Sequence, residues 1–471
     1  MWTEAADPRF PAPADRSRNR KWEPRIRNRE RRELETWPLR RAHGTIFFVL
    51  DRRRFLQLSA AAAASVPLAA RARHDLPARN PYGITNGVAK LPAWDGATSS
   101  ASVPGSMRMF RGNLTHSYYG SGVVPEQPRL VWKFRMADYA TTLRDQPIVW
   151  KGTGWTGQAL KYGDHVFVGS TGGHFHCFEA LTGKVVWVFA AERMFKGSPA
   201  LYKNRIYVPN VDNHLRCLDA ATGAVIWDWV GDTDMDSSPR IVDGMVYVGG
   251  EDGELKCLDA ETGQLVWKHD FGAGTGDEPG STGIESSLAI VDGIAYFGHL
   301  DGHVRAYSLC DRKLVWKRHL GVDIDASCLV LGDRIYVGVE DGRPTFHCLD
   351  RHTGKDVWTH HIPEGVWSSA AHAGDTVIVG GNNGKLYCFD AACGEVAWTF
   401  QSGAGIWSSP SVVDGKVLFG SYDRFYRMLD VTTGQLIWRY DIEDRSHSGA
   451  AIEDGHIWVG GASGFFYCFG P

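Results

Sequence analysis

One position in each of eight repeated segments carries a side chain that could do chemistry, and the residue differs from one segment to the next. Three consecutive segments have a carboxylate there, Asp236, Glu285 and Asp325. Carboxylate oxygens are the ligands that a hard cation such as Ca²⁺ prefers, so all three are candidate calcium ligands. Repulsion between neighbouring carboxylates could instead raise the pKa of one of them and create a general base. For that second role Asp325 and Asp236 are the candidates.

The other segments have aromatic, basic or hydroxyl side chains at this position. Trp367 and Trp407 could stack on a planar ligand, and Lys196 or His447 could hold an anionic group. Thr156 completes the set, so the candidate ligand-binding residues beside the carboxylates are Thr156, Lys196, Trp367, Trp407 and His447. We call all eight residues the rim positions. The alternative is that they are ordinary solvated side chains at the mouth of a channel, although the mixed acidic and aromatic clustering exceeds what a plain solvated rim needs.

A phrase that ends in tryptophan defines the segments and gives their alignment. Asp259-Ala-Glu-Thr-Gly-Gln-Leu-Val-Trp267 is one copy. Its tryptophan recurs about every 40 residues, which indicates a repeat architecture. The seven copies end at Trp187, Trp227, Trp267, Trp316, Trp358, Trp398 and Trp438. Two long connections, Ala137–Trp155 and Asp270–Ile284, lead into the face that carries the rim positions, and the second is a candidate lid.

Each segment reads as four short antiparallel strands. Runs rich in Val, Ile, Tyr and Leu end in Asp-Gly or Thr-Gly, which favour tight turns between paired strands. Four such strands in about 40 residues describe one blade of a β-propeller. The last segment stops after three strands, whereas Arg129-Leu-Val-Trp132-Lys matches the missing fourth. We predict an all-β protein, an eight-bladed β-propeller of four-stranded antiparallel blades over residues 128–471, with the ring closed by the N-terminal strand near Trp132.

Most of the nine cysteines occupy one repeated position. Cys177, Cys217, Cys257, Cys348 and Cys388 each lie ten residues before their tryptophan, and Cys468 matches them in the last segment. Ala306 and Met428 take the place in two others. One buried position per blade filled by a small apolar side chain explains this pattern, so we expect free thiols rather than disulfides.

The repeat, in its fullest form Ala-x-Asp-x-x-Thr-Gly-x-x-x-Trp, resembles the tryptophan-docking repeat of pyrroloquinoline quinone (PQQ)-type β-propellers. The resemblance covers residues ~128–471 and implies that the repeated tryptophans pack between adjacent blades. Met109-Phe-Arg-Gly-Asn113 resembles the lead-in of exported bacterial members. Cys310-Asp-Arg-Lys313 departs from the Thr-Gly pattern, so the outer turn of blade four should be irregular.

The first 127 residues have a different composition. Asp51-Arg-Arg-Arg-Phe-Leu-Gln57, an alanine-rich run and Ala70-Arg-Ala72 together predict a twin-arginine export signal over residues 51–72. The alanine-rich run is too short for a transmembrane span, which needs ~20 residues. Residues 1–50 are predicted to be disordered, or an extension upstream of a start of translation near residue 49 or 50, and residues 73–127 to be a linker and lead-in.

Two function classes follow. Residues 1–72 hold 16 Lys and Arg against 8 Asp and Glu, while the whole chain has a net charge of −3, so the exported part is acidic and nucleic acid is not expected as a partner. The first class is an exported binding module, periplasmic or extracellular, that takes a planar or sugar-like ligand or a protein partner through its central funnel. The alternative that the resemblance implies is a dehydrogenase oxidising an alcohol or sugar with PQQ and calcium. Against that alternative, the chain lacks an adjacent Cys-Cys pair and long insertions.

Overall fold

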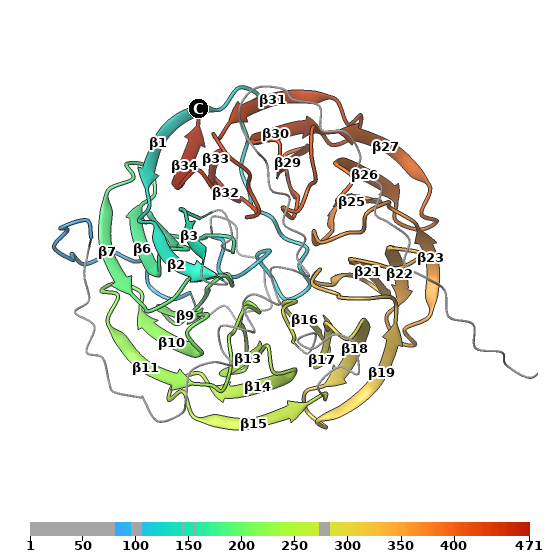
Figure 1. Cartoon of the computed structure of the whole chain (residues 1–471), viewed down its shortest axis with the longest axis horizontal. Coiled ribbons are helices and arrows are strands. Elements are labelled where there is room, and N and C mark those ends of the chain that lie inside the picture. Colours follow the sequence, from blue (N-terminus) through green and yellow to red (C-terminus); the bar gives the residue numbers. More distant parts are fainter. Residues whose placement is uncertain (1–80, 96–105, 144–145, 154–156, 273–282) are drawn as a thin grey trace, which may run out of the picture. The chain divides into compact units, whose positions relative to one another are not determined.

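The computed structural model describes residues 81–95, 106–143, 146–153, 157–272 and 283–471. These residues form 34 strands and no α-helix, and eight four-stranded antiparallel sheets are arranged in a ring (Figure 1). The predicted eight-bladed β-propeller is therefore confirmed. The predicted extension and export signal lie outside the described residues. Within the described part of the chain, no helix is long and apolar enough to cross a membrane.

The strands run from the innermost to the outermost in each blade. Blades 1 to 4 consist of β4 (Leu160–Tyr162), β5 (His165–Gly169), β6 (His174–Glu179) and β7 (Val185–Ala190); β8 (Ala200–Tyr202), β9 (Arg205–Pro209), β10 (His214–Asp219) and β11 (Val225–Val230); β12 (Arg240–Val242), β13 (Met245–Gly249), β14 (Glu254–Asp259) and β15 (Leu265–Asp270); and β16 (Ala289–Val291), β17 (Ile294–Gly298), β18 (His303–Ser308) and β19 (Lys313–His319). Blades 5 to 8 consist of β20 (Leu329–Leu331), β21 (Arg334–Gly338), β22 (Phe346–Asp350) and β23 (Asp356–His360); β24 (Ala371–Ala373), β25 (Thr376–Gly380), β26 (Lys385–Asp390) and β27 (Val396–Gln401); β28 (Ser411–Val413), β29 (Lys416–Gly420), β30 (Phe425–Asp430) and β31 (Leu436–Asp441); and β32 (Ala451–Glu453), β33 (His456–Gly460), β34 (Phe465–Gly470) and β1 (Arg129–Arg135).

Burial explains the sequence pattern of the strands. The third strand of a blade, such as β14, is buried over its four central residues because neighbouring blades cover both of its faces. Cys257 in that strand is 1% exposed, as the repeated cysteine position predicts. The outermost strand, such as β15, alternates between exposed and half-buried residues because only one of its faces meets a neighbouring blade.

The N-terminal strand closes the ring, as predicted. β1 pairs antiparallel with β34, and Trp132 lies opposite Cys468 in the register. In Figure 1, β1 is found beside the C-terminal strand of the same blade. This pairing adds the fourth strand to blade 8 and covers the edge of β34, which would otherwise be unpaired.

The repeated tryptophans connect adjacent blades through the Thr-Gly turn. The indole nitrogen of Trp187 donates a hydrogen bond to the carbonyl of Ala220 in blade 2. Gly223, three residues further on, has φ +74, and a Cβ atom there would lie 2.6 Å from the Trp187 ring. Glycine is therefore required at position 223 for two reasons: its backbone conformation and the close packing of the Trp187 ring against it.

The outer turn of blade 4, expected to be irregular, keeps the left-handed conformation at the position where the other blades have glycine. Arg312 takes the place of the glycine, with φ 54. Its guanidinium lies over the Trp267 ring, 5.8 Å from the centroid. A cation–π contact thus replaces the glycine contact at this interface.

Residues 106–124 cross the inner ends of the blades and connect them. Leu201 donates a backbone hydrogen bond to Arg108, Ile290 donates one to Leu114, and the Asp454 amide donates one to Ser121. The segment thereby contacts innermost strands on opposite sides of the ring. The composition of residues 106–124 predicts only a lead-in, because they contain no repeat.

Two buried guanidinium groups fix this segment. Arg111 is 2% exposed and donates hydrogen bonds to the carbonyls of Ala370 and Pro410. Arg240 is fully buried, donates to the carbonyl of Phe110 at 2.9 Å and contacts the ring of His116. Burial, together with the charge of Arg111, lowers the pKa of Arg240 to about 9. Arg111 thus joins the segment to blades 6 and 7, and Arg240 of blade 3 holds it at Phe110 and His116, so the segment acts as an internal cross-brace.

The first long connection contains a hairpin. β2 (Tyr139–Leu143) pairs antiparallel with β3 (Gln146–Trp150) in a sheet of its own. Most of the second connection, the candidate lid at Asp270–Ile284, lies outside the described residues. Residues 81–95, in the stretch predicted as a linker, contact blades 1 and 2 through the hydrogen bonds of Gly87 to Val186 and of Ala89 to Ala221.

Candidate functional site

Each described rim position lies in the connection that enters the innermost strand of its blade. Asp236, for example, lies between the fully buried Met235 and Ser237, four residues before β12. All seven side chains are half-buried whereas both flanking residues are buried: Lys196, Asp236, Glu285, Asp325, Trp367, Trp407 and His447. Thr156 lies outside the described residues. Each connection therefore leaves its rim side chain partly exposed to solvent, while the residues on either side are buried.

A ladder of serines holds the connections against one another. The amide of Ser198 donates a hydrogen bond to Oγ of Ser238, and that of Ser238 donates to Oγ of Ser287. The pattern continues through the next three blades with distances of 2.9 to 3.0 Å. These bonds lie two residues beyond the rim positions, so the spacing of neighbouring rim side chains is fixed by amide-to-serine hydrogen bonds between blades.

A second repeated contact brings another residue of blades 2 to 8 to the rim. The turn after the second strand folds back, and its amide donates to a carbonyl two residues before the rim position. In blade 3 this bond joins the Glu251 amide to the Asp234 carbonyl at 3.1 Å. In blade 7 it joins Tyr422 to Gly405 at 3.0 Å. Glu251 and Tyr422 are therefore site residues that the alignment on tryptophans did not identify.

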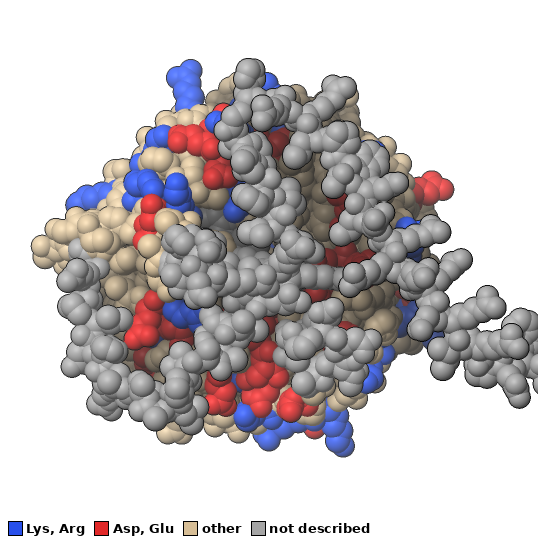
Figure 2. All heavy atoms as spheres, viewed as in Figure 1, with Lys and Arg blue, Asp and Glu red and all other residues tan. Residues whose placement is uncertain are grey.

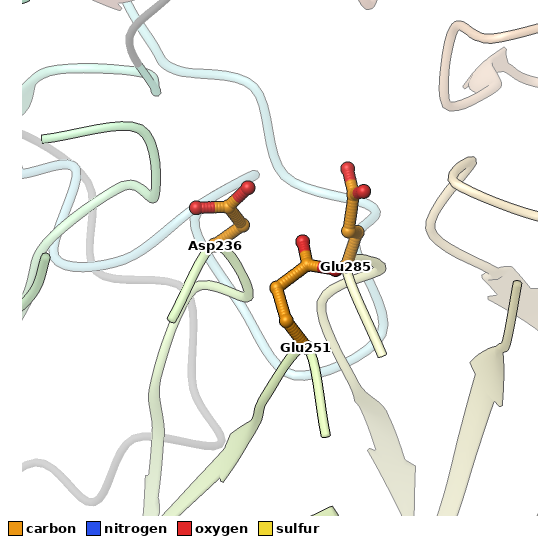
Figure 3. A group of neighbouring side chains, drawn as sticks. All are labelled: Asp236, Glu251 and Glu285. Atoms are coloured by element: carbon orange, nitrogen blue, oxygen red, sulfur yellow. The ribbon is translucent and has the colours of Figure 1, made fainter. Parts of the chain in front are cut away.

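Three carboxylates converge in blades 3 and 4. Asp236, Glu251 and Glu285 each have an oxygen atom within 4.8 Å of the others, and they come from three different loops (Figure 3). The ammonium group of Lys196, from blade 2, forms an ion pair with Oδ2 of Asp236. We call the three carboxylates the acidic group. It contains two of the three predicted calcium ligands, with Glu251 in place of Asp325.

The charges of the acidic group perturb one another. Burial and the charges of Glu285 and Asp236 raise the pKa of Glu251 well above its usual range. Burial opposes the charge of Lys196, but Asp236, Glu285 and Glu251 together raise its pKa. Lys196 is therefore charged at neutral pH, and Glu251 is the carboxylate that holds a proton most readily.

Asp234 extends the negative charge around the acidic group. Its carboxylate pairs with Arg193 at 3.3 Å. Burial and the nearby Asp236 raise its pKa to about 6 in spite of this pairing. In the face shown in Figure 2, acidic side chains gather over the inner part of the blade that contains β13 and β14. This part of the site holds more negative charge than its basic residues neutralise.

Three aromatic residues and a histidine pack together in blades 6, 7 and 8. The ring centroids of Trp367 and Trp407 are 3.8 Å apart, and those of Trp407 and Tyr422 are 4.1 Å apart. The Tyr422 hydroxyl is hydrogen-bonded to Nε2 of His447, whose ring lies 5.2 Å from that of Trp407. Burial, with the charge of Arg445, lowers the pKa of His447 well below its usual range. We call these four residues the aromatic group.

The structure thus brings together six of the eight rim positions, three in the acidic group with its partner Lys196 and three in the aromatic group. Asp325 occupies the equivalent position in blade 5, half-buried between Ile324 and Ala326, and lies outside the set of three convergent carboxylates. The roles of general base, metal ligand and cofactor contact stay predictions for all of these residues.

The side chains can be tested against the calcium ion and PQQ that the resemblance implies. The charged ammonium of Lys196 already contacts Asp236, so a divalent ion in the acidic group would bring two like charges together. A planar ring sandwiched between Trp367 and Trp407 would need two stacking gaps of ~3.5–4 Å each, whereas their centroids are 3.8 Å apart. With Lys196 charged and the indoles in contact, this arrangement does not fit such a pair.

Comparison with known proteins identifies the family to which the fold belongs. The model of the family described as outer membrane protein assembly factor BamB matches residues 122–360 and 300–455, which is more than half of the chain. The chain belongs to this family. The matched residues include blades 1 to 7 and β1, so the PQQ-type repeat predicted from the tryptophan phrase is confirmed.

Similar solved structures have different functions. BamB from Moraxella catarrhalis is 18% identical, covers 72% of this chain and 98% of its own, and has a TM-score of 0.56. A europium-containing methanol dehydrogenase is 15% identical with 78% and 98% coverage and a TM-score of 0.61. Quinohemoprotein alcohol dehydrogenase from Comamonas testosteroni is 14% identical with 79% and 81% coverage and a TM-score of 0.62. No curated protein matches the sequence. At these identities the likeness shows the fold alone, so function must be argued from the site.

Proposed function

We propose that this chain is a non-catalytic binding module that receives a ligand or a loop of a protein partner on its rim. The observation that carries the proposal is that, in each of the seven blades where the position is described, one partly exposed, non-repeating side chain lies between two buried residues. Repeated side chains serve the scaffold, whereas variation at one accessible position is what a recognition surface requires.

The two groups on the rim define what such a ligand would contact. The acidic group with Asp234 offers negative charge, and the aromatic group offers flat apolar surface with a polar edge. A planar or sugar-like molecule, or a protein loop that carries aromatic and basic side chains, has the matching chemistry. The serine ladder and the cross-brace of residues 106–124 keep the rim rigid, which limits the entropy lost on binding.

The second candidate is a dehydrogenase dependent on PQQ and calcium. The three convergent carboxylates favour it, because oxygen ligands from separate loops are the donor set of a calcium site. Such an ion would have to displace Lys196 from Asp236. The binding module needs no such rearrangement, so it is the function that this geometry supports better.

The proposal includes export of the propeller. The support is the arginine pair Arg52-Arg53 followed by Phe55, Leu56 and the alanine-rich run. A periplasmic or extracellular module would meet its partner after export by the twin-arginine route. Substitution of both arginines by lysine, with fractionation of the cells, tests the route.

Site-specific photocrosslinking tests the binding function. A photoreactive phenylalanine analogue replaces Trp407 in one protein and Lys184, a 74% exposed residue on the far edge of blade 1, in the control. We expect a discrete product from position 407 that is absent from position 184. The same product should weaken when Asp236 and Glu285 are both alanine. No rim-specific product, together with oxidation of an alcohol on addition of PQQ and Ca²⁺, would establish the dehydrogenase instead.

A further inference from the structure

The acidic group is filled by a cation that the chain itself supplies. Lys196 reaches from blade 2 to Asp236 in blade 3, and its side chain is only 16% exposed. The Asp236 side chain is 6% exposed, and its second oxygen, Oδ1, is buried without a hydrogen-bond partner among the described residues. A nearly buried carboxylate with one unsatisfied oxygen needs a positive charge close by. In this structure the ammonium group meets that need.

The same carboxylates have the spacing of a metal site. Calcium–oxygen distances are about 2.3–2.6 Å, so two ligands on opposite sides of the ion are separated by about 5 Å. The oxygens of Asp236, Glu251 and Glu285 lie within 4.8 Å of one another. The donor set and its span would therefore suit a calcium ion if the lysine were removed.

We infer that Lys196 is the resident cation of the acidic group and the residue that excludes divalent metal ions from the rim. The inference rests on the proposed binding function and names the side chain that separates it from metal-dependent chemistry. Loss of the ammonium group leaves Asp236, Glu251 and Glu285 without their counter-charge, and a calcium ion would then restore it. One substitution should convert a site closed to metals into a calcium site.

Isothermal titration calorimetry with Ca²⁺ on the full chain tests the inference. Methionine at position 196 keeps an unbranched side chain of similar length without the charge. We expect the Lys196→Met protein to bind one Ca²⁺ at least tenfold more tightly than the wild type. Calcium should also raise the melting temperature of Lys196→Met but not that of the wild type. The added substitution Glu285→Gln should abolish the gain.

Two matched variants separate the charge at this site from a general loss of positive charge. Lys184→Met removes a lysine from the exposed pair with Glu179, 3.2 Å apart, and should leave calcium binding as in the wild type. Lys196→Arg retains the positive charge and should remain unable to bind. Wild-type or Lys196→Arg protein that binds Ca²⁺ as tightly as Lys196→Met would overturn the inference, and so would a folded Lys196→Met protein that does not bind.

Binding of Ca²⁺ by the wild type or by Lys196→Arg overturns the inference even if Lys196→Met does not fold. The result is also independent of the crosslinking test, which uses Trp407 in the aromatic group and no metal. A rim that captures a partner while the wild type also binds Ca²⁺ would refute the role of Lys196 and leave the binding function standing. A wild type that neither binds Ca²⁺ nor captures a partner would leave the role of Lys196 standing and refute the binding function.

Discussion

Asp234 should make the protein less stable as the pH rises, and Asp234→Asn should remove this effect. The pKa of Asp234 is raised to about 6, first by burial and then by the charge of Asp236, against an ordinary value of 3.8. A raised pKa means that the folded state binds the proton more tightly than the unfolded state. The stability that this proton contributes is present below about pH 4 and is lost as the pH rises through 6.

The size of the effect follows from the shift. A pKa raised by about two units lowers the free energy of unfolding by about 3 kcal/mol at pH 7.5, where the carboxyl is ionised in both states. At pH 4.5, where the folded state keeps the proton and the unfolded state has partly lost it, the same shift lowers it by about 1 kcal/mol. The attraction of Arg193 is already contained in this shift because it lowers the pKa of Asp234, so the loss of the ion pair is not subtracted again. Arg193 keeps its hydrogen bond to the Val211 carbonyl at 3.0 Å. The gain on Asp234→Asn is therefore about 3 kcal/mol at pH 7.5 and about 1 kcal/mol at pH 4.5.

Thermal unfolding at the two pH values measures this difference. An unfolding entropy of roughly 0.7 kcal/mol/K for a domain of ~340 residues converts about 3 kcal/mol into about 4 °C and about 1 kcal/mol into about 1.5 °C. Asp234→Asn should therefore melt about 4 °C above the wild type at pH 7.5 and about 1.5 °C above it at pH 4.5. Asp333→Asn, at a carboxylate 71% exposed, is the matched control and should show no such pH dependence. An equal gain at both pH values, or none at pH 7.5, would refute the claim that the acidic part of the rim holds excess buried charge.

Three further outcomes test the scaffold and the rim. Gly223→Ala should cost about 1–3 kcal/mol more than Gly244→Ala in urea unfolding, because both glycines have positive φ but only Gly223 lies against a tryptophan; equal losses would show that the Trp187 contact is unimportant. In the native protein a thiol reagent should modify two cysteines, the exposed Cys310 and Cys393, and all nine after denaturation; rapid modification of more than two would contradict the buried position in each blade. Tyr422→Phe removes the hydrogen bond to His447 and should cost about 1 kcal/mol while the packing on Trp407 persists; a loss above about 3 kcal/mol would mean that Tyr422 supports the fold rather than the rim.

The fold could be predicted from the sequence because each blade repeats the same local solutions. Thr-Gly before each tryptophan specifies both a turn and the surface on which the preceding blade packs, as Gly223 and Trp187 show. The unmatched strand around Trp132 could have only one partner, the three-stranded last segment. By contrast, the role of Arg111 could not be predicted from the sequence, because the carbonyls to which it donates belong to residues 259 and 299 positions further along the chain.

Of the site residues, only the rim positions could be predicted, because the alignment on the tryptophans identifies one such position in each segment. Lys196 and Asp236 occupy that position in adjacent blades, so their contact follows from the order of the blades. Glu251 and Tyr422 lie in a different turn and reach the rim through a backbone bond to the connection beside it. A signal for them does exist: the same turn position varies from blade to blade, as Val211, Leu300 and Asn382 show. That variation identifies a second ring of rim residues only once the turn is known to fold toward the first.

Thermal unfolding of the full chain with and without PQQ and Ca²⁺, singly and together, tests the central claim that the rim is a binding surface rather than a cofactor site. A ligand present at 100 times its Kd stabilises the folded state by about 2.7 kcal/mol, or roughly 4 °C for a domain of this size. With Lys196 paired to Asp236 and Trp367 packed on Trp407, we predict no shift under any of the three conditions. A stabilisation that requires PQQ and Ca²⁺ together would contradict the account and identify the protein as a quinone-dependent dehydrogenase.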